Sequence, residues 1–477
     1  MTQLDENVMR VLQMLQDGKI STTEAEALIA ALRGEKSSAP KSAPTPEPEP
    51  EPAQRSPMGD FASRIKTQKI EFDFEHLGDR ISKAVAKVHP EKIVARVQAQ
   101  LRTATKSSAS WGATVSARVR QWADGDDARP SNTAGLPEHS EINAQDFHLE
   151  INANVLVENP FGNVTIIGTD DDKAHVNYTK VVWGAAESLR ALAGTLSVDY
   201  FANDTRLDVK VNAPDHFKDG VLDLELRVPR SVSNRTSTRF GDVAITGILG
   251  RVEAVSTSGT LKLSELGSDL RCESVSGDID LQKILGSVTV ASESGEIGVT
   301  EVLRGLTANS VSGDVTASNV EGGKVECKSV SGDVKVHSVG ANAPLDIIVE
   351  SVSGDASLTN ATGNVAIKAV SGDVHAQDLV ASRVQAHTVS GDVNVRIATS
   401  FSGTVQINTV SGDVELALPS DTNARVSLST SSGDLRCDHD ATGVVATETL
   451  WTGTVGTGAG NVTIQTISGG SHVAQIG

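Results

Sequence analysis

The stretch Val370-Ser371-Gly372-Asp373-Val374-His375-Ala376 is one copy of a unit that recurs through the second half of the chain. Ser-Gly-Asp is unchanged in the copies that end at Asp278, Asp314, Asp333, Asp355, Asp373, Asp392, Asp413 and Asp434, and it is imperfect at Phe240-Gly241-Asp242, Ser258-Gly259-Thr260 and Ser294-Gly295-Glu296. Successive copies lie 18 to 22 residues apart, counted on the glycines. A period of about twenty residues is typical of a solenoid, in which each repeat buries its apolar face only by stacking on its neighbours.

Within each repeat, apolar residues recur at every second position. Val374 and Ala376 alternate with Asp373 and His375, which is the pattern of a strand with one face in the core and one face outside. A second turn falls roughly half-way between the Ser-Gly-Asp corners, at Gly267, Gly286, Gly305, Gly322, Gly323, Gly363 and Gly403. We therefore predict a mainly β fold, a parallel β-solenoid (β-helix) of about 11–12 coils with inward Val, Ile, Leu and Ala.

The composition excludes several classes of protein. The chain has 477 residues, a net charge of −19 and 3% aromatic residues, and the acidic balance argues against nucleic-acid binding. The sequence shows neither the apolar core of a signal peptide nor a run of eighteen apolar residues, so we expect a cytoplasmic protein that can at most lie at the inner face of the membrane. Cys272, Cys327 and Cys437 are too few and too scattered for a disulfide framework, so we expect reduced thiols.

The sequence predicts six segments. They are a helical hairpin (1–34), a disordered Pro/Glu-rich linker (35–60), a basic amphipathic helical segment (61–123), a loop (124–141), irregular opening β-coils (142–239) and the Ser-Gly-Asp repeat solenoid (240–477). A hairpin of about thirty residues is marginal alone, so we expect it to self-associate or to bind a protein partner.

The two ends of the β region depart from the regular repeat. The opening coils are expected to contain strands at 147–157, 163–167, 174–182, 195–200, 206–211 and 221–228, with a short helix at 185–193. The stretch 461–467, followed by Ser468-Gly469-Gly470, is expected to be a last, decaying coil that closes the array.

The basic segment 61–123 contains twelve Lys or Arg against five Asp or Glu. Three apolar helical faces can be drawn in it, over 77–88, 93–101 and 111–122. Such faces can cover the open end of the solenoid or pack on each other, bind a protein partner, or lie in an anionic membrane surface. The contact residues predicted for a membrane or a partner are Trp111, Arg118, Arg120, Trp122, Lys83 and Lys87.

The run from about residue 142 to 477 resembles a bacterial putative-adhesin β-strand-repeat domain family of unknown function. The resemblance rests on the segment 163–168, on the strand end Leu226-Arg227-Val228-Pro229 and on the repeated Val-Ser-Gly-Asp-Val unit. The hairpin with Asp17-Gly18-Lys19-Ile20-Ser21 resembles the small helical module found ahead of such domains in LiaX- and YvlB-like proteins. The resemblance implies a β-solenoid and, in some members, a role in sensing envelope stress or antimicrobial peptides.

The Ser-Gly-Asp corner is explained first by turn chemistry. Glycine supplies a positive φ, and the Ser and Asp side chains can bond to nearby backbone amides. Stacked coils would also place the eight aspartates in one column, where neighbours about 5 Å apart repel by about 1 kcal/mol unless they are bonded or neutralised. A cation along the column is therefore the alternative, although the glycine-aspartate nonapeptide of calcium-binding β-rolls is absent.

The sequence gives little support for catalysis. His337, His375, His387 and His439 occur at different phases of the repeat, and no phosphate-binding loop or zinc spacing occurs, so we expect no enzyme, no catalytic residue and no cofactor. The favoured hypothesis is a non-enzymatic scaffold or regulator that presents a rigid acidic solenoid, with the envelope-stress role at the inner membrane surface taken from the resemblance. The alternative is a self-assembling polymer or an adhesin-like surface protein.

Overall fold

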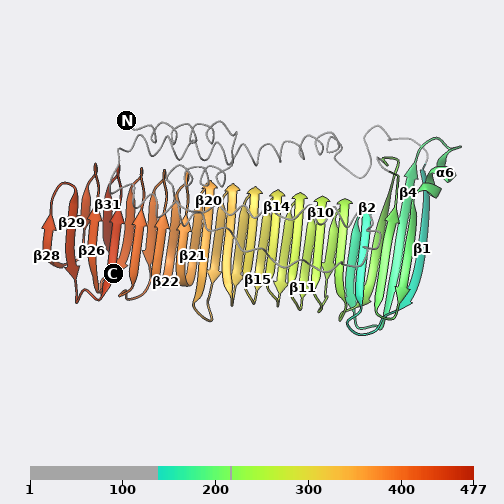
Figure 1. Cartoon of the computed structure of the whole chain (residues 1–477), viewed down its shortest axis with the longest axis horizontal. Coiled ribbons are helices and arrows are strands. Elements are labelled where there is room, and N and C mark those ends of the chain that lie inside the picture. Colours follow the sequence, from blue (N-terminus) through green and yellow to red (C-terminus); the bar gives the residue numbers. More distant parts are fainter. Residues whose placement is uncertain (1–137, 215–216, 477) are drawn as a thin grey trace, which may run out of the picture. The chain divides into compact units, whose positions relative to one another are not determined.

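A computed structural model describes residues 138–214 and 217–476, and within them the chain is mainly β (Figure 1). The hairpin, the linker, the basic segment with its tryptophans, and residues 124–137 of the predicted loop lie outside the described residues. The helix α6 (Leu189–Thr195) is the only one within them.

The first strands, from the blue-green end of Figure 1, are β1 (Glu138–His148), β2 (Asn154–Phe161), β3 (Val164–Thr169), β4 (Lys173–Trp183), β5 (Ser197–Asn203), β6 (Arg206–Asn212), β7 (Gly220–Pro229), β8 (Ser233–Phe240) and β9 (Val243–Thr246). The regular repeats comprise β10 (Val252–Ser258), β11 (Leu261–Leu266), β12 (Leu270–Ser276), β13 (Ile279–Ile284), β14 (Val288–Ser294), β15 (Ile297–Val302), β16 (Leu306–Ser312), β17 (Val315–Val320), β18 (Lys324–Ser331), β19 (Val334–Val339), β20 (Leu345–Ser353), β21 (Ala356–Lys368), β22 (Val374–His387), β23 (Val393–Ile397), β24 (Thr404–Asn408) and β25 (Val414–Pro419). The last strands are β26 (Ala424–Ser429), β27 (Leu435–Cys437), β28 (Ala441–Ala446), β29 (Leu450–Val455), β30 (Gly460–Gln465) and β31 (Ser471–Ile476).

In the regular repeats each strand pairs with the strand one coil further on. β10 pairs in parallel with β12, and β11 with β13, so that one coil contributes a strand to each of two facing ladders. The registers bring equivalent residues together, for example Ser258 with Ser276. Further along, Ser353 bridges to Ser371 and Ser371 to Ser390. The corners therefore lie over one another, and the repeat region has a β-solenoid-like fold.

The core fills the space between the two ladders. Alternate residues of each strand are buried, as in β12, where Leu270 and Cys272 face inward. These side chains join into one apolar cluster that runs from Leu149 to Val473. Cys272 and Cys327 occupy the same position three coils apart and are both buried and free.

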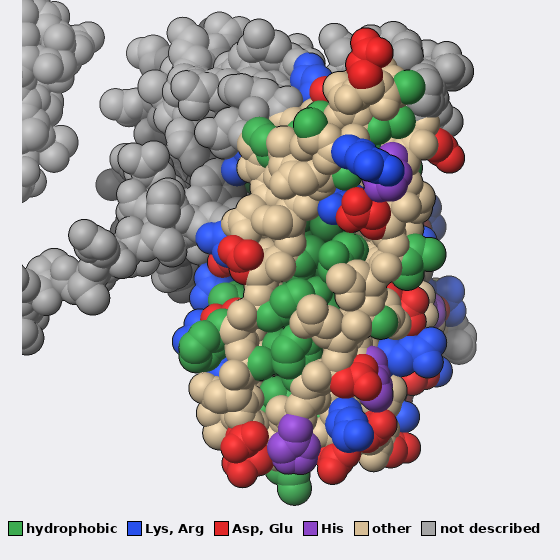
Figure 2. Space-filling model, turned by 90° about the vertical axis from the view of Figure 1, so that its right-hand side faces the viewer, with side chains coloured by type: hydrophobic (Ala, Val, Ile, Leu, Met, Phe, Trp, Pro, Cys, Tyr) green, Lys and Arg blue, Asp and Glu red, His purple; other side chains and the backbone are tan. Residues whose placement is uncertain are grey.

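At the first end the coils are not in sequence order. β2 lies between β6 and β8, and β3 lies between β7 and β9, all in parallel. Three antiparallel strands then cover this end: β4 pairs with β7, β1 with β4, and β5 with β6. In the view onto this end, hydrophobic side chains form a band in the middle, flanked by charged ones (Figure 2).

Several predicted boundaries at this end were wrong. The predicted strand 147–157 is two strands, because the chain turns after β1 at Asn152, which has a φ of 63°. The loop predicted to extend to residue 141 ends before Glu138, because β1 gains a full antiparallel ladder with β4. The predicted helix at 185–193 begins later, at Leu189.

The other end has a similar exchange of order. β30 lies between β24 and β26, and β31 lies between β25 and β27. The antiparallel strands β29 and β28 then follow β26. The prediction that 461–470 closes the array was therefore wrong, since this coil inserts before the coil of β26 and β27.

The corner glycines are required by a close approach between coils. Gly391 has a φ of +149°, and a Cβ at this position would lie 2.1 Å from the carbonyl oxygen of Gly372 in the preceding coil. The same contact recurs at Gly332, Gly354 and Gly412, at 2.4, 2.4 and 2.0 Å. Because the obstacle is the backbone of the preceding corner, it cannot move without breaking the stack.

We expect Gly391→Ala to lower the free energy of unfolding by about 3 kcal/mol or more, since it combines backbone strain with a clash. The measurement is urea unfolding followed by circular dichroism. Gly194→Ala, in α6, is the control: nothing lies within 4 Å of its added Cβ, and helix propensity predicts a change between zero and about 1 kcal/mol in the stabilising direction. Equal losses in both variants would contradict this account of the corner.

Candidate functional site

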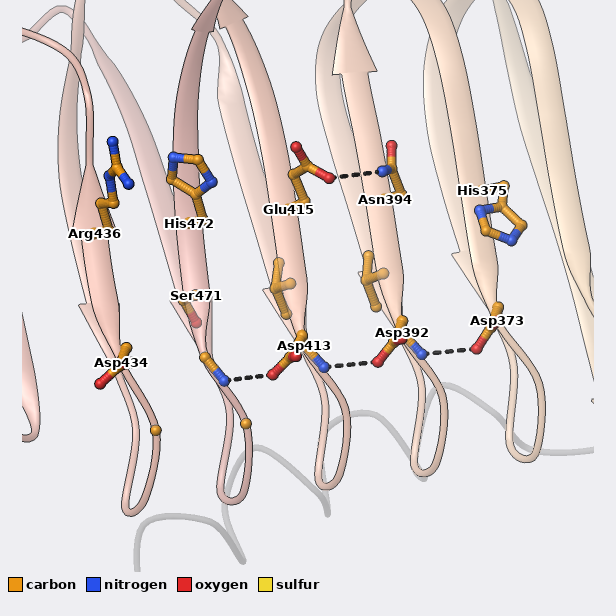
Figure 3. Close-up of a pocket in the computed structure, with 15 residues that line it drawn as sticks. Asp373, His375, Asp392, Asn394, Asp413, Glu415, Asp434, Arg436, Ser471 and His472 are labelled. Atoms are coloured by element: carbon orange, nitrogen blue, oxygen red, sulfur yellow. Dashed lines mark hydrogen bonds between the residues drawn. The ribbon is translucent and has the colours of Figure 1, made fainter.

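The corner aspartates form a hydrogen-bonded ladder between coils. The backbone N–H of Asp373 donates to Oδ1 of Asp355 at 2.8 Å, and the N–H of Asp392 donates to Oδ1 of Asp373 at 2.8 Å. The same bond joins Asp413 to Asp392, and Figure 3 shows the run from strand to strand. The sequence predicted bonds to nearby amides of the turn; these bonds instead reach the neighbouring coil, because the stacked corner presents its N–H to the carboxylate.

The ladder does not require a charge at every step. Asn163 occupies the corner of the β2–β3 coil, and its Oδ1 accepts from the N–H of Asp242 at 2.9 Å. At the other end the N–H of Gly470 donates to Oδ1 of Asp413 at 2.7 Å. The predicted contact between Asp413 and Asp434 was therefore wrong, because Gly470 of the inserted coil lies between them.

The hydrogen bonds offset part of the repulsion expected along the column. The backbone N–H of Asp355 and the ammonium of Lys335 lower the pKa of the Asp333 carboxyl. At the second corner, the N–H and hydroxyl of Ser287 lower the pKa of Asp269. Within 138–214 and 217–476, no group of three or more His, Cys, Asp or Glu side chains could hold a metal ion. Cation binding along the column stays an untested alternative.

A groove of about 790 Å³ borders the column near the last coils. It is lined by Asp373, Asp392, Asp413 and Asp434 and by a row of outward side chains, His375, Asn394, Glu415, His472 and Arg436. Figure 3 shows these side chains projecting from neighbouring strands.

Hydrogen bonds fix part of this row. Asn394 donates to Glu415 Oε2 at 3.0 Å. The ring of His472 lies 2.8 Å from Asp438 Oδ2, and together with Arg436 it lowers the pKa of Asp438. The groove is thus an open polar surface carrying both signs of charge.

The histidines considered from the sequence do not converge. His375 lines the groove, His387 bonds to Asn408 on the other ladder, and His439 is buried. His472, which the sequence analysis missed, joins the row of His375. Its position two residues after the corner residue Gly470, like His375 after Asp373, was the available signal.

A buried row of hydroxyl side chains was also missed, because only Val, Ile, Leu and Ala were expected inside. The row occupies the position two residues before every corner serine except Ser371, at Ser256, Ser274, Ser292, Ser310, Ser329, Ser351, Thr388, Thr409, Thr430 and Thr466. Ser329 Oγ donates to the carbonyl of Gly313 at 3.0 Å, and Ser351 Oγ donates to that of Gly332 at 3.1 Å. The hydroxyls of these coils therefore bond to the preceding corner.

The predicted contact residues of the basic segment, from Lys83 to Trp122, lie outside the described residues, so their roles stay predictions.

Comparison with known proteins identifies the repeat region. Residues 282–402 and 377–473 match the family model described as Toastrack DUF4097. Residues 282–473 of the repeat region are thus similar to the Toastrack domain family. The family resemblance seen in the sequence is thereby confirmed, and residues 6–37 match the model of a SHOCT-like domain. No curated protein is significantly similar to this chain.

Solved structures similar to this chain share little sequence with it. A putative cell adhesion protein from Clostridium sporogenes is 9% identical, with 71% of this chain and 100% of that chain covered and a TM-score of 0.18. A putative adhesin from Parabacteroides distasonis is 12% identical, with 70% and 97% covered and a TM-score of 0.23. A putative lipid binding protein from the same organism is 11% identical, with 71% and 97% covered and a TM-score of 0.21.

Substitutions of Asp355 distinguish the hydrogen-bonding role of the column from the effect of its charge. We expect Asp355→Asn to raise the free energy of unfolding by up to about 1 kcal/mol, because the amide oxygen still accepts the N–H of Asp373, as Asn163 does for Asp242, while the repulsion from Asp333 and Asp373 is removed. Asp355→Ala removes the acceptor and should cost about 1 kcal/mol. Chemical denaturation of the three proteins measures both. If Asn costs as much as Ala, the carboxylate charge and not the hydrogen bond holds the corner.

The hydroxyl row gives a second matched pair. Ser351→Ala should lower the free energy of unfolding by about 1 kcal/mol, because it removes the bond to Gly332. Ser310→Ala should be neutral or slightly stabilising, because the buried Ser310 hydroxyl has no partner and Ala369 fills the equivalent position. Thermal melts report the difference, and a larger loss at Ser310 would refute the assignment.

Proposed function

We propose that this chain is a non-enzymatic, adhesin-like scaffold that binds a cationic polypeptide partner along its acidic corner column. The observation that carries the proposal is the ladder itself. One oxygen of each laddered carboxylate bonds to backbone of the next coil, as at Asp373 and Asp392, so the charges cannot swing apart. A regular row of fixed negative charge attracts a basic partner and orients it.

The groove supports a partner of extended shape. Its lining combines four column aspartates with the outward row at His375 and His472. An open surface of this kind suits a chain laid along the coils better than a small molecule held in a closed cavity.

The alternative of an end-to-end polymer has less support. A solenoid polymerises by adding parallel coils to free ends. Here the antiparallel strands β4 and β5 cover the last parallel coil at one end, and β29 with β28 flanks β26 at the other. The proposed scaffold therefore acts as a discrete particle.

The proposal also includes a regulatory role for the scaffold, and this role depends on segments outside the described residues. The SHOCT-like match at 6–37 supports a small association module ahead of the scaffold. Within the described residues no helix is long and apolar enough to cross a membrane. Placement at the inner membrane surface and a role in envelope stress remain parts of this proposal.

The test titrates the full chain with deca-lysine by calorimetry at low salt. The variant Asp373→Asn/Asp392→Asn/Asp413→Asn keeps the acceptor oxygens and removes three charges. We expect it to weaken binding about 5-fold or more, and added salt to weaken binding to the unmodified chain more than binding to the variant.

The control variant, Asp204→Asn/Asp280→Asn/Asp346→Asn, removes the same number of charges from outside the column. It should weaken binding less than 2-fold. Equal losses in the two variants would show that deca-lysine responds to net charge alone and would overturn the column as the binding site.

A further inference from the structure

One outward row of the solenoid is apolar. In β12, β16, β18 and β20 the residue that precedes the corner serine points away from the core, since the hydroxyl residue before it points inward; in the later coils the same position follows the end of the strand. At these positions stand Val275, Val311, Val330, Val352, Val370, Val389, Val410 and Ile467, which we name the outer valine stripe. The corner bridges of Ser353 with Ser371 and of Ser371 with Ser390 align these residues from coil to coil. A stripe of this length is an uncommon feature of a surface that faces water.

The later half of the stripe is buried although it lies outside the main core. Val352, Val370, Val389, Val410 and Ile467 are only 4–9% exposed, although none of them belongs to the main core cluster. Nearer the start, Glu293 interrupts the stripe, and burial raises the pKa of its carboxyl. Water therefore has little access to the stripe from Val352 onward.

The neighbouring outward row is also poorly exposed to water. Glu350 is 4% exposed, and its carboxylate lies 3.0 Å from Lys328 Nζ and 3.3 Å from Lys368 Nζ. An ion pair on the outside of a sheet is normally solvated, and its burial costs free energy unless the surface is covered for another reason. The covered surface therefore spans at least two rows.

We propose that the basic amphipathic segment 77–122 of the same chain packs along the outer valine stripe. Its apolar faces, over 77–88, 93–101 and 111–122, carry the aliphatic and tryptophan side chains that would bury the valines. This docking does not depend on the partner proposed above.

Charge complements the apolar match. The segment 61–123 holds twelve basic and five acidic residues. The stripe runs beside the aspartate column, because each stripe valine lies three positions before a corner aspartate, as Val370 lies before Asp373. Lysines and arginines that flank the apolar faces can therefore approach the carboxylates while the valines are covered.

The chain length permits the contact. Fifteen residues, 123–137, separate the segment from β1, and at about 3.3 Å each they can span about 50 Å. From β1, six strand spacings lead through β4, β7, β3, β9 and β11 to β13, which shares a coil with β12 and Val275, a distance of about 29 Å at the spacing of neighbouring strands.

The experiment is hydrogen exchange by mass spectrometry on the full chain. In the unmodified protein, amides of 77–122 should be protected. In Val370→Lys/Val389→Lys, two like charges in the stripe should repel the segment, and its amides should exchange about 10-fold faster or more. Thr359→Lys/Gln377→Lys, two outward neighbours on the other ladder, should leave the protection unchanged.

Other occupants of the stripe give different results. If light scattering finds a dimer that Val370→Lys/Val389→Lys separates while exchange in 77–122 is unaltered, a second copy covers the stripe and the proposal is wrong. Protection of 77–122 only after anionic vesicles are added also overturns it. Should the double lysine variant unfold in a thermal melt, Val370→Ala/Val389→Ala takes its place, and a smaller acceleration confined to 77–122 is expected.

Discussion

The close approach of backbone at successive corners is the constraint on which the rest of this structure depends. At Gly412, for example, the carbonyl oxygen of Gly391 lies 2.0 Å from where a Cβ would be. This contact fixes the coil spacing and the register together, because neither corner can shift without meeting the next. The aspartate ladder follows from it, since each carboxylate then lies within hydrogen-bond distance of an N–H one coil away. The inward hydroxyls that reach the preceding glycine carbonyl depend on the same alignment.

The same constraint accounts for the exchanged coils at both ends. The coil of β2 and β3 has its own corner glycine, Gly162, whose carbonyl oxygen lies 2.2 Å from a Cβ built on Gly241. At the other end Gly469 stacks between Gly412 and Gly433. A Cβ built on Gly469 would lie 2.1 Å from the carbonyl oxygen of Gly412, and a Cβ built on Gly433 would lie 2.1 Å from that of Gly469. Both coils thus fit the column although they are out of sequence order. The exchange leaves chain on the outside to form antiparallel strands, which occupy edges that would otherwise accept further coils.

The repeat region was predictable from the sequence because its determinants recur at fixed offsets. Glycine, aspartate and alternating valines each appear many times, so one period identifies corner and strand together. The coil order at the ends was not predictable from the sequence, because packing between distant segments decides whether β30 pairs with β24 or follows β26. Ser329 and Ser351 were missed for a different reason: a polar residue in an alternating pattern is normally assigned to the outside, and only the neighbouring glycine carbonyl makes its burial favourable. For the site, the column was predicted, but its interruption by Gly470 depends on the inserted coil.

The use of aspartate at the corner exceeds what the fold needs. Asn163 shows that an amide oxygen accepts the same backbone N–H, so asparagine could complete the ladder with no repulsion between coils. A column of carboxylates about 5 Å apart instead costs about 1 kcal/mol per neighbouring pair before screening. The hydrogen bond explains why an acceptor oxygen stands at each corner but leaves the charge unexplained. A charge held in place at a cost to stability has its natural explanation in what it attracts, whether the basic segment of this chain, a separate cationic partner, or each in turn.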